Sequence, residues 1–402
     1  MIAYACNPTG SGEHWLGWGW AEQAARAYQV DLITTTNNQP QVKKSARALG
    51  ITAHFVGIPE WFRKLSDHLG GGGNWLRKIW WQIRVARLAE SLHRQAPFAL
   101  AHQTTFHTFR VPFLAARLDI PCVWGPIAGG EFVPPGFFRF LGAAKFGEYG
   151  RRMVNRLWLQ FPPVKKSFRR AAIIFVSNST TLDFLPSWVR AKCRLVPPNA
   201  LRPQDEKFIA NPRTVSPSAT LRLLYVGNCV AIRALPLVFE ALIESGLTDY
   251  KLTIVGNGPA LPEWKRLAAQ LGISGKVAFT GLVPYEKLDE YYGEADALVF
   301  PALRDSGGSS LLEAMARGLP VVCLDWAGPG EMVDKECGIK IPVTEPQMAV
   351  KAFAEALKRL NQEPALGAAL ARAAQQRALN LFRWEEKFRV LQASYGKLIK
   401  GP

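Results

Sequence analysis

The sequence predicts an α/β protein built from two Rossmann-like domains. Its length of 402 residues corresponds to two or three domains. Along both halves, short apolar runs alternate with glycine-containing loops and helical patterns, which is typical of parallel β-α-β units. A polar, proline-containing segment at residues 201–220 separates the halves. We therefore expect an N-terminal domain at 1–200, a linker at 201–220, a C-terminal domain at 221–380, and a final helix at 381–402 that packs back on the first domain.

Charge is concentrated in the first half of the chain. The chain has 49 Lys and Arg residues and 32 Asp and Glu residues. Residues 1–200 contain 25 basic and 10 acidic residues, a balance of +15. Residues 201–402 contain 24 basic and 22 acidic residues, a balance of +2. Such asymmetry points the first half toward an anionic surface, either a phospholipid leaflet or nucleic acid. The six cysteines are scattered, which argues against a zinc-ribbon pattern and favours a reducing compartment. We expect no N-terminal signal and no membrane span.

The first half begins with a βαβ pattern. Met1–Cys6 predicts a strand, Asn7–Gly19 a glycine-rich loop that carries Glu13, and Trp20–Tyr28 a helix. The loop does not match the dinucleotide fingerprint GxGxxG, so close approach of a substrate to the backbone is the better interpretation. Further strands are predicted at Val30–Thr35, Phe98–Gln103, Pro121–Trp124, Ile173–Val176 and Arg194–Val196.

Two segments of the first half combine tryptophan and arginine with apolar stripes. Residues 71–94 form a predicted helix with Leu76, Ile79, Trp80, Ile83 and Ala86 at helical spacing and arginines around them. Residues 137–170 have the same character. This composition is that of helices that lie in a membrane interface, although a core-packed surface helix would show it too. The presence of two such segments favours the membrane interpretation.

His102 ends a predicted strand, where substrate-facing groups lie in open α/β sheets. A lone histidine is more often structural, and His107 competes with it for such a role.

The second half predicts five parallel strands whose loops share one edge. They are Leu221–Val226, Leu252–Val255, Val277–Thr280, Ala297–Phe300 and Leu319–Leu324. After the fourth strand, Gly307 and Gly308 precede a helix, and free N–H groups at a helix start can bind phosphate. Asp305 and Glu313 can flank a diphosphate there and bind hydroxyl groups. An ordinary capped helix with surface acids is the alternative.

Several motifs together resemble the retaining nucleotide-sugar glycosyltransferases of family 4, which have the GT-B fold. The second half carries them almost continuously: VGNCVAIRA, IVGNGP, VAFTGLVP, ADALVFPALRDSGGSSLLEAMARGLPVV and LFRWEEKF. The first half fits more loosely, through GSGEHWLGWGW, IFVSNS and LVPPNA. The resemblance implies two Rossmann-like domains that face a central cleft, the first binding the acceptor and the second the nucleotide sugar.

The resemblance also implies roles for individual residues. The family's acidic pair falls on Asp305 and Glu313, which would hold a sugar hydroxyl and the ribose, and its basic pair falls on Asn228 and Arg233. With His102 facing the sugar, the implied catalytic set is Asp305, Glu313, Arg233 and His102. The implied donor site adds Gly12, Gly227, Asn228, Gly256, Gly281, Leu282, Val283, Ser306, Gly307, Gly308 and Ser309, and the expected acceptor site comprises Glu13, His102 and His107.

Two departures from the family pattern affect the donor site. Asp305 stands where the family has glutamate, so its carboxylate reaches about 1.5 Å less, and a misplacement of about 1 Å can cost about 100-fold in rate. Asn228 removes a charge opposite the leaving diphosphate, so Arg233 and the helix terminus must stabilise that charge.

The resulting hypothesis is a metal-independent transfer with retention, without a cofactor other than the nucleotide sugar. The basic first half suggests a lipid-linked glycan acceptor in cell-envelope polysaccharide assembly, and a cytoplasmic protein bound peripherally to the inner membrane face. A catalytically weak sugar-nucleotide-binding scaffold is the alternative. A third possibility is that the basic first half binds nucleic acid, but the sequence contains no recognisable nucleic-acid-binding motif.

Overall fold

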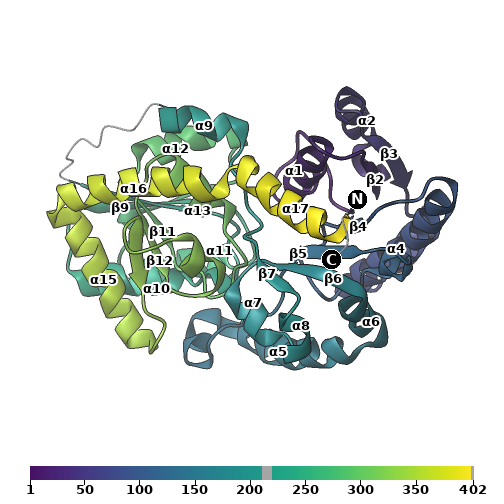
Figure 1. Cartoon of the computed structure of the whole chain (residues 1–402). Coiled ribbons are helices and arrows are strands. Elements are labelled where there is room, and N and C mark those ends of the chain that lie inside the picture. Colours follow the sequence, from purple (N-terminus) through teal and green to yellow (C-terminus); the bar gives the residue numbers. More distant parts are fainter. Residues whose placement is uncertain (211–219, 400–402) are drawn as a thin grey trace. The chain divides into compact units, whose positions relative to one another are not determined.

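The computed structural model describes residues 1–210 and 220–399 and divides the chain into two compact units (Figure 1). Unit 1 comprises Met1–Gly130, Arg152–Pro198 and the C-terminal segment that begins at Trp384. Unit 2 comprises Glu131–Arg151 and Asn199–Arg383. Each unit is built on one parallel sheet with helices around it, as the sequence predicts. None of the described helices is long and apolar enough to cross a membrane.

The strands of unit 1 form a seven-stranded sheet with the order β3-β2-β1-β4-β5-β6-β7, and every pairing is parallel. Strand β3 was not predicted from the sequence, because its residues are mostly half-exposed and lack a continuous apolar run. The strands are β1 (Ile2–Ala3), β2 (Asp31–Thr35), β3 (Thr52–Val56), β4 (Ala101–Gln103), β5 (Cys122–Ile127), β6 (Ala171–Val176) and β7 (Cys193–Leu195).

The helices of unit 1 include one that begins earlier than predicted. Helix α1 starts at Glu13, inside the segment that the sequence predicts as loop. Its Gly17 allows close approach to Ala5, just after β1, and its Gly19 allows close approach to helix α17. A Cβ atom at Gly19 would lie 1.9 Å from the Trp384 ring of α17. The helices are α1 (Glu13–Ala25), α2 (Gln39–Ala48), α3 (Glu60–Asp67), α4 (Gly70–Gln95), α6 (Pro162–Arg170), α7 (Ser179–Phe184), α8 (Ser187–Arg190) and α17 (Trp384–Ile399), and α5 (Lys145–Gln160) crosses the division.

Helix α4 packs on the core through part of the predicted apolar stripe, Ala86 and Ile79, and through the neighbouring face. Trp81, Val85 and Ala89 are buried in the unit 1 core, whereas Leu76 and Ile83 are exposed at 37% and 38%. The helix is therefore core-packed on one side and keeps exposed apolar side chains on another.

Unit 2 contains a six-stranded parallel sheet with the order β10-β9-β8-β11-β12-β13, one strand more than predicted. Its strands are β8 (Leu221–Val226), β9 (Tyr250–Val255), β10 (Val277–Gly281), β11 (Ala297–Phe300), β12 (Val321–Leu324) and β13 (Gly338–Ile341). Its helices are α9 (Pro203–Ala210), α10 (Leu235–Ser245), α11 (Leu261–Gln270), α12 (Leu288–Glu294), α13 (Ser309–Ala316), α14 (Ala327–Met332), α15 (Pro346–Gln362) and α16 (Pro364–Phe382).

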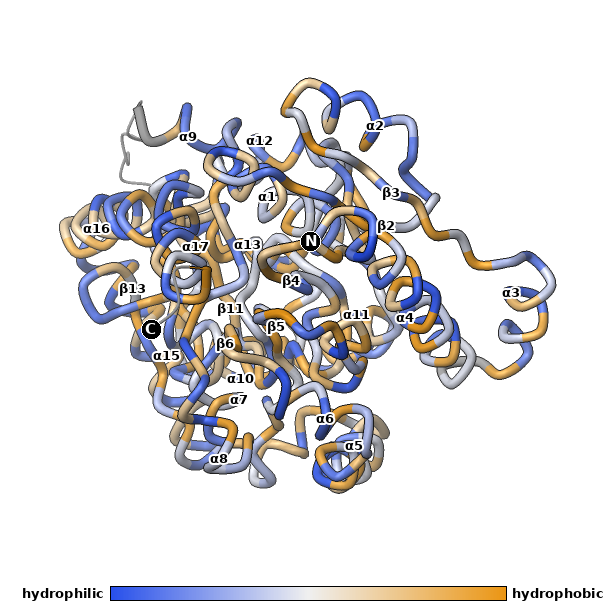
Figure 2. The backbone as a smooth tube through the Cα atoms, turned by 45° about the vertical axis from the view of Figure 1, so that its right-hand side comes forward, coloured by the Kyte–Doolittle hydropathy of each residue, from blue (hydrophilic) through white to orange (hydrophobic). Residues whose placement is uncertain are grey.

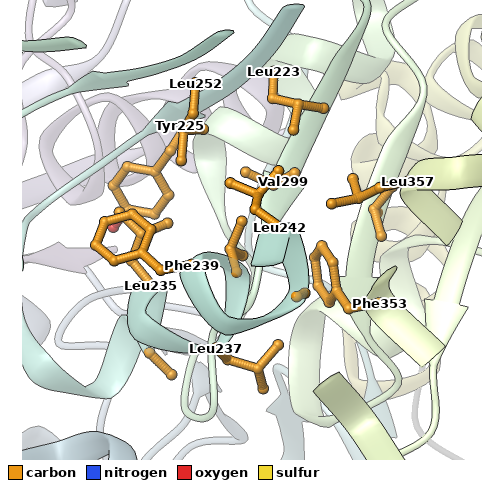
Figure 3. Close-up of a cluster of buried hydrophobic side chains, with 14 of the residues drawn as sticks. Leu223, Tyr225, Leu235, Leu237, Phe239, Leu242, Leu252, Val299, Phe353 and Leu357 are labelled. Carbon is orange, nitrogen blue, oxygen red and sulfur yellow. The ribbon is translucent and has the colours of Figure 1, made fainter. Parts of the chain in front are cut away.

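The main core of unit 2 lies between the sheet and helices α10 and α15. Figure 3 shows Leu242 of α10 near Val299 of β11 in the middle of this cluster, with Phe239 of α10 on one side and Phe353 of α15 on the other. Phe137, from the segment 131–151, is fully buried in the same cluster, which explains why that segment belongs to unit 2 although the sequence analysis assigns it to the domain at 1–200. Within the predicted linker 201–220, α9 is helical and residues 211–219 lie outside the described residues.

Candidate functional site

The loop between β11 and α13 holds the Asp305 carboxylate inside a ring of donors. The Gly307 and Gly308 N–H groups donate to its Oδ1 at 2.8 and 2.9 Å. Arg233 Nη1 donates to its Oδ2 and forms an ion pair with it. Gly308 has φ 61°, which a residue with a side chain rarely adopts, and this turn directs the two N–H groups inward. Both carboxylate oxygens are thus engaged within unit 2.

Arg233 comes from the loop after β8 and is mostly buried. Its side chain is 20% exposed, that of Asp305 is 9% exposed, and its guanidinium carbon lies 5.2 Å from the centre of the Phe300 ring. Burial raises the pKa of Asp305, but the Arg233 charge and the two glycine N–H groups outweigh this and hold the pKa below its ordinary value. Asp305 is therefore ionised at neutral pH, and the structure brings it together with Arg233, Gly307 and Gly308.

Glu313 lies one turn into α13 and contacts two tyrosines of the α12 region. The Tyr292 hydroxyl donates to its Oε2 at 3.0 Å, and the Tyr285 hydroxyl donates to its Oε1 at 3.4 Å. Burial, followed by the negative charge of Asp205, raises the pKa of Glu313 although the Tyr292 hydrogen bond lowers it. The raised pKa means that burial destabilises the ionised carboxylate. A ligand hydroxyl that donates a hydrogen bond to it would replace part of the solvation that the carboxylate loses on burial.

Arg317 organises the surroundings of Glu313 and was not identified from the sequence. It is 5% exposed, donates to the Glu313 carbonyl oxygen at 3.0 Å, and forms ion pairs with Asp205 at 3.0 Å and Asp289 at 2.6 Å. Asp205 belongs to α9 and Asp289 to α12, so one guanidinium joins three helices. The i,i+4 spacing of Glu313 and Arg317 was visible in the sequence, but the two aspartates meet them only through the fold.

The glycines predicted at the donor site lie in three loops that meet at the carboxyl edge of the sheet. Gly227 N–H donates to the Val255 carbonyl oxygen and Gly256 N–H to that of Gly281. A Cβ atom at Gly256 would lie 1.9 Å from the Gly227 carbonyl oxygen, so only glycine allows the loops to approach this closely.

The other predicted donor residues differ in exposure. Asn228 is exposed and Leu282 is 76% exposed, whereas Val283 packs partly against the core. Ser309, the first residue of α13, is exposed, and Ser306 is half-buried beside the closely packed Gly328.

In unit 1, the loop before α1 and the loop after β4 meet at one edge of the sheet. Glu13 Oε1 accepts a hydrogen bond from the His107 N–H at 2.9 Å. The Nε2 atom of His107 is buried and has no hydrogen-bond partner among the described residues. Burial lowers the pKa of His107, and the Glu13 charge opposes this shift. Glu13 and His107 are therefore neighbours in unit 1, and Glu13 directly follows Gly12 in the chain.

The position of His102 does not agree with a substrate-facing role. Its side chain is 0% exposed, its Nδ1 lies 2.6 Å from the Tyr395 hydroxyl, and its Nε2 lies 2.7 Å from the Gly125 carbonyl oxygen. Burial lowers its pKa to about 3. Because β4 is a central strand and α17 covers its end, His102 is a core residue of unit 1 with both ring nitrogens engaged.

Comparisons by sequence with known proteins match part of the chain. Residues 210–377 match the family model described as "Glycosyl transferases group 1". A 27% identical match over 255 residues links the chain to the GDP-mannose-dependent alpha-(1-6)-phosphatidylinositol monomannoside mannosyltransferase of Mycolicibacterium smegmatis, covering 57% of this chain and 64% of that protein. A second match, to the D-inositol 3-phosphate glycosyltransferase of Streptomyces avermitilis, is 29% identical over 212 residues. It covers 49% of this chain and 45% of that protein. The matches thus span less than two thirds of either relative.

The fold extends the likeness to the whole chain. The crystal structure of HepE from Anabaena in complex with UDP has a TM-score of 0.64 to this chain, with 12% sequence identity and 99% of each chain covered. At this identity the likeness concerns the fold alone. It confirms the predicted GT-B type of fold, two parallel-sheet α/β domains.

Proposed function

Because residues 210–377 belong to the group 1 glycosyl transferases, we propose that the chain transfers a sugar from a nucleoside diphosphate sugar to an acceptor hydroxyl. The observation that carries this proposal is the cluster of anion-binding groups around Asp305. Arg233 and the Gly307 and Gly308 N–H groups converge on one point at the start of α13. A guanidinium and backbone N–H groups at a helix N-terminus are a favourable arrangement for a diphosphate.

The proposed mechanism assigns the leaving diphosphate to this cluster. Negative charge develops on the diphosphate as the bond to the sugar breaks, and preorganised donors in a partly buried site stabilise such charge strongly. Asn228 is neutral where the family pattern has a second basic residue. Arg233 and the N–H groups at the start of α13 supply the donors instead. Glu313 binds the ribose hydroxyls, and its two tyrosines and Arg317 hold it in place.

Retention of the anomeric configuration, and reaction without a metal or other cofactor, are further parts of the proposal. They follow from the resemblance to family 4, in which the leaving phosphate deprotonates the acceptor hydroxyl. This route needs no protein base, which is compatible with a buried His102.

For the acceptor we propose a lipid-linked glycan of cell-envelope polysaccharide assembly. The balance of +15 over residues 1–200 suits a protein held peripherally at the anionic inner face of the cytoplasmic membrane. The name of the Mycolicibacterium relative, a phosphatidylinositol monomannoside mannosyltransferase, agrees with an acceptor that carries a lipid. We assign no nucleic-acid partner. The acceptor would contact the loops of Gly12, Glu13 and His107.

A second candidate function is a sugar-nucleotide-binding scaffold with weak activity. The observation that favours it is the engagement of both Asp305 oxygens inside unit 2: Oδ1 accepts two N–H groups and Oδ2 accepts Arg233, so fewer acceptor positions are left for a sugar hydroxyl.

Nucleotide release from a panel of nucleoside diphosphate sugars, with and without a polyprenyl-lipid extract, separates the two functions. For the transferase we expect acceptor-dependent release from one donor, and at least a 100-fold loss of release in Glu313→Gln. Glu355→Gln, an exposed glutamate on α15, is the matched control and should release nucleotide like the wild type. Saturable binding of a nucleotide without release from any donor would instead establish the scaffold.

A further inference from the structure

Unit 1 contains a cavity that the proposed transfer reaction does not use. It has a volume of about 320 Å³ and lies between the 3₁₀ helix η2 (Leu114–Arg117) and the start of α6. This volume is at the lower end of the range of about 300–1,000 Å³ typical of small-molecule sites. Apolar side chains and the polar or charged Ser167, Lys166, Arg117 and Arg170 form its lining, the apolar ones being Phe113, Leu114, Ala116, Pro162 and Pro163.

The polar groups of the cavity interior are already satisfied. Ser167 is 2% exposed, and its hydroxyl accepts a hydrogen bond from the Phe113 N–H at 3.0 Å and donates to the Pro163 carbonyl oxygen at 2.8 Å. Because the Ser167 hydroxyl is already hydrogen-bonded and its neighbours are apolar, the interior suits an apolar group.

The rim of the cavity is cationic and only partly neutralised. Arg117 is held by Glu90, and Arg170 is 3.9 Å from Asp119, whose side chain is fully exposed, so that second pair is weak. Lys166 is exposed and forms no ion pair with any residue in the described part of the chain. An apolar interior under a cationic rim is complementary to an amphiphile that has a negatively charged head.

The neighbouring surface indicates where such an amphiphile comes from. Residues 152–170 carry no acidic residue and six basic ones: Arg152, Arg156, Lys165, Lys166, Arg169 and Arg170. Met153, Val154 and Leu157 on this part of α5 are exposed at 64%, 47% and 65%. Figures 1 and 2 both place α5 beside α6. Exposed apolar side chains among basic ones are the composition of a membrane-interface surface.

We propose that this cavity binds an acyl chain of an anionic membrane lipid, with the lipid phosphate at Lys166 and Arg170. The chain enters between η2 and α6, while Met153 and Leu157 contact the surrounding lipid. This inference concerns unit 1 only and does not depend on sugar transfer.

Binding of a fluorescent lysophosphatidylglycerol below its micelle concentration tests the site directly. We expect saturable binding at least tenfold tighter than that of the matched lysophosphatidylcholine. Ala116→Leu adds three carbons to the cavity wall. Because each buried methylene contributes about a fourfold factor in affinity, this variant should weaken binding at least tenfold. Lys166→Gln should weaken it about fivefold, whereas Lys44→Gln, an exposed lysine of α2, should leave it unchanged.

Four results would overturn the proposal. They are no saturable binding of lysophosphatidylglycerol, equal binding of both lipids, equal effects of the Lys166 and Lys44 substitutions, and wild-type affinity in a folded Ala116→Leu variant. If Ala116→Leu does not fold, Leu114→Trp provides the second measurement. Its fluorescence should be quenched by a lysophosphatidylglycerol with a brominated chain, and an absence of quenching would equally contradict the site.

Discussion

Replacing Asp305 by asparagine tests the role of the carboxylate that occupies the anion-binding cluster. The Asp305 side chain accepts hydrogen bonds from the Gly307 and Gly308 N–H groups and pairs with Arg233. Since these are the groups proposed to bind the diphosphate, the carboxylate and a phosphate compete for them. Asp305→Asn keeps the size and one oxygen acceptor but removes the charge.

The substitution should change stability and binding in opposite directions. Removing one partner of a buried ion pair costs about 3–5 kcal/mol, and the side-chain exposures of 20% for Arg233 and 9% for Asp305 place this pair at the lower end, near 3 kcal/mol. In contrast, two unit charges about 4 Å apart repel by about 4 kcal/mol at an effective dielectric constant of 20. Losing even a third of that repulsion strengthens diphosphate binding about tenfold. The affinity for a nucleoside diphosphate should therefore rise at least tenfold, whereas sugar transfer falls.

Isothermal titration with UDP and GDP measures the binding, and urea unfolding measures the stability. Asp334→Asn is a closely matched control. The Asp334 carboxylate accepts the Glu336 and Cys337 N–H groups at 3.0 and 2.9 Å and pairs with Arg377 at 2.5 Å. Breaking this second pair should lower stability without changing nucleotide affinity. An unchanged or reduced nucleotide affinity in Asp305→Asn would refute the competition.

The pH dependence of the same variant provides a further check. Because the folded protein lowers the pKa of Asp305, its stabilisation is present above the ordinary aspartate pKa and is lost as the pH falls through the lowered value. The stability difference between wild type and Asp305→Asn should therefore be largest above about pH 5 and disappear in acid. A difference that stays constant down to pH values near 2 would contradict this origin.

Three buried groups give further pH-dependent predictions. Burial, followed by the charge of Asp205, raises the pKa of Glu313, so the unfolding free energy should fall as the pH rises from the ordinary glutamate pKa through the raised one, and Glu313→Gln should remove this slope in urea titrations. His102, with its pKa lowered to about 3, should stay neutral by NMR down to about pH 4, while the protein loses stability below pH 6.5. Tyr395→Phe removes the 2.6 Å contact to that ring and should cost about 1 kcal/mol in urea unfolding. Burial lowers the pKa of Lys387 to about 7, so stability should rise between about pH 7 and 10.5, and this rise should be absent in Lys387→Met.

The strands of unit 2 were largely predictable because each is a short, continuous apolar run between turn residues. Leu221–Val226 and Ala297–Phe300 were predicted with the bounds that the structure shows, since both are buried on their two faces. Strand β13 (Gly338–Ile341) was missed because its two central residues are half-exposed and include Lys340. Periodicity alone does not distinguish such an edge strand from a loop.

The sequence by itself determined the fold class and the loop that carries Asp305, because glycines and apolar runs act over a few neighbouring positions. It did not determine which polar groups pair across the fold. Arg233 and Asp305 are 72 residues apart, and His102 meets Tyr395 across 293 residues. Only tertiary packing decides whether a polar side chain ends beside a free donor, inside the core or in solvent. For this reason a histidine predicted to face substrate is a core residue, and an acid predicted to bind sugar holds the anion-binding groups of its own loop.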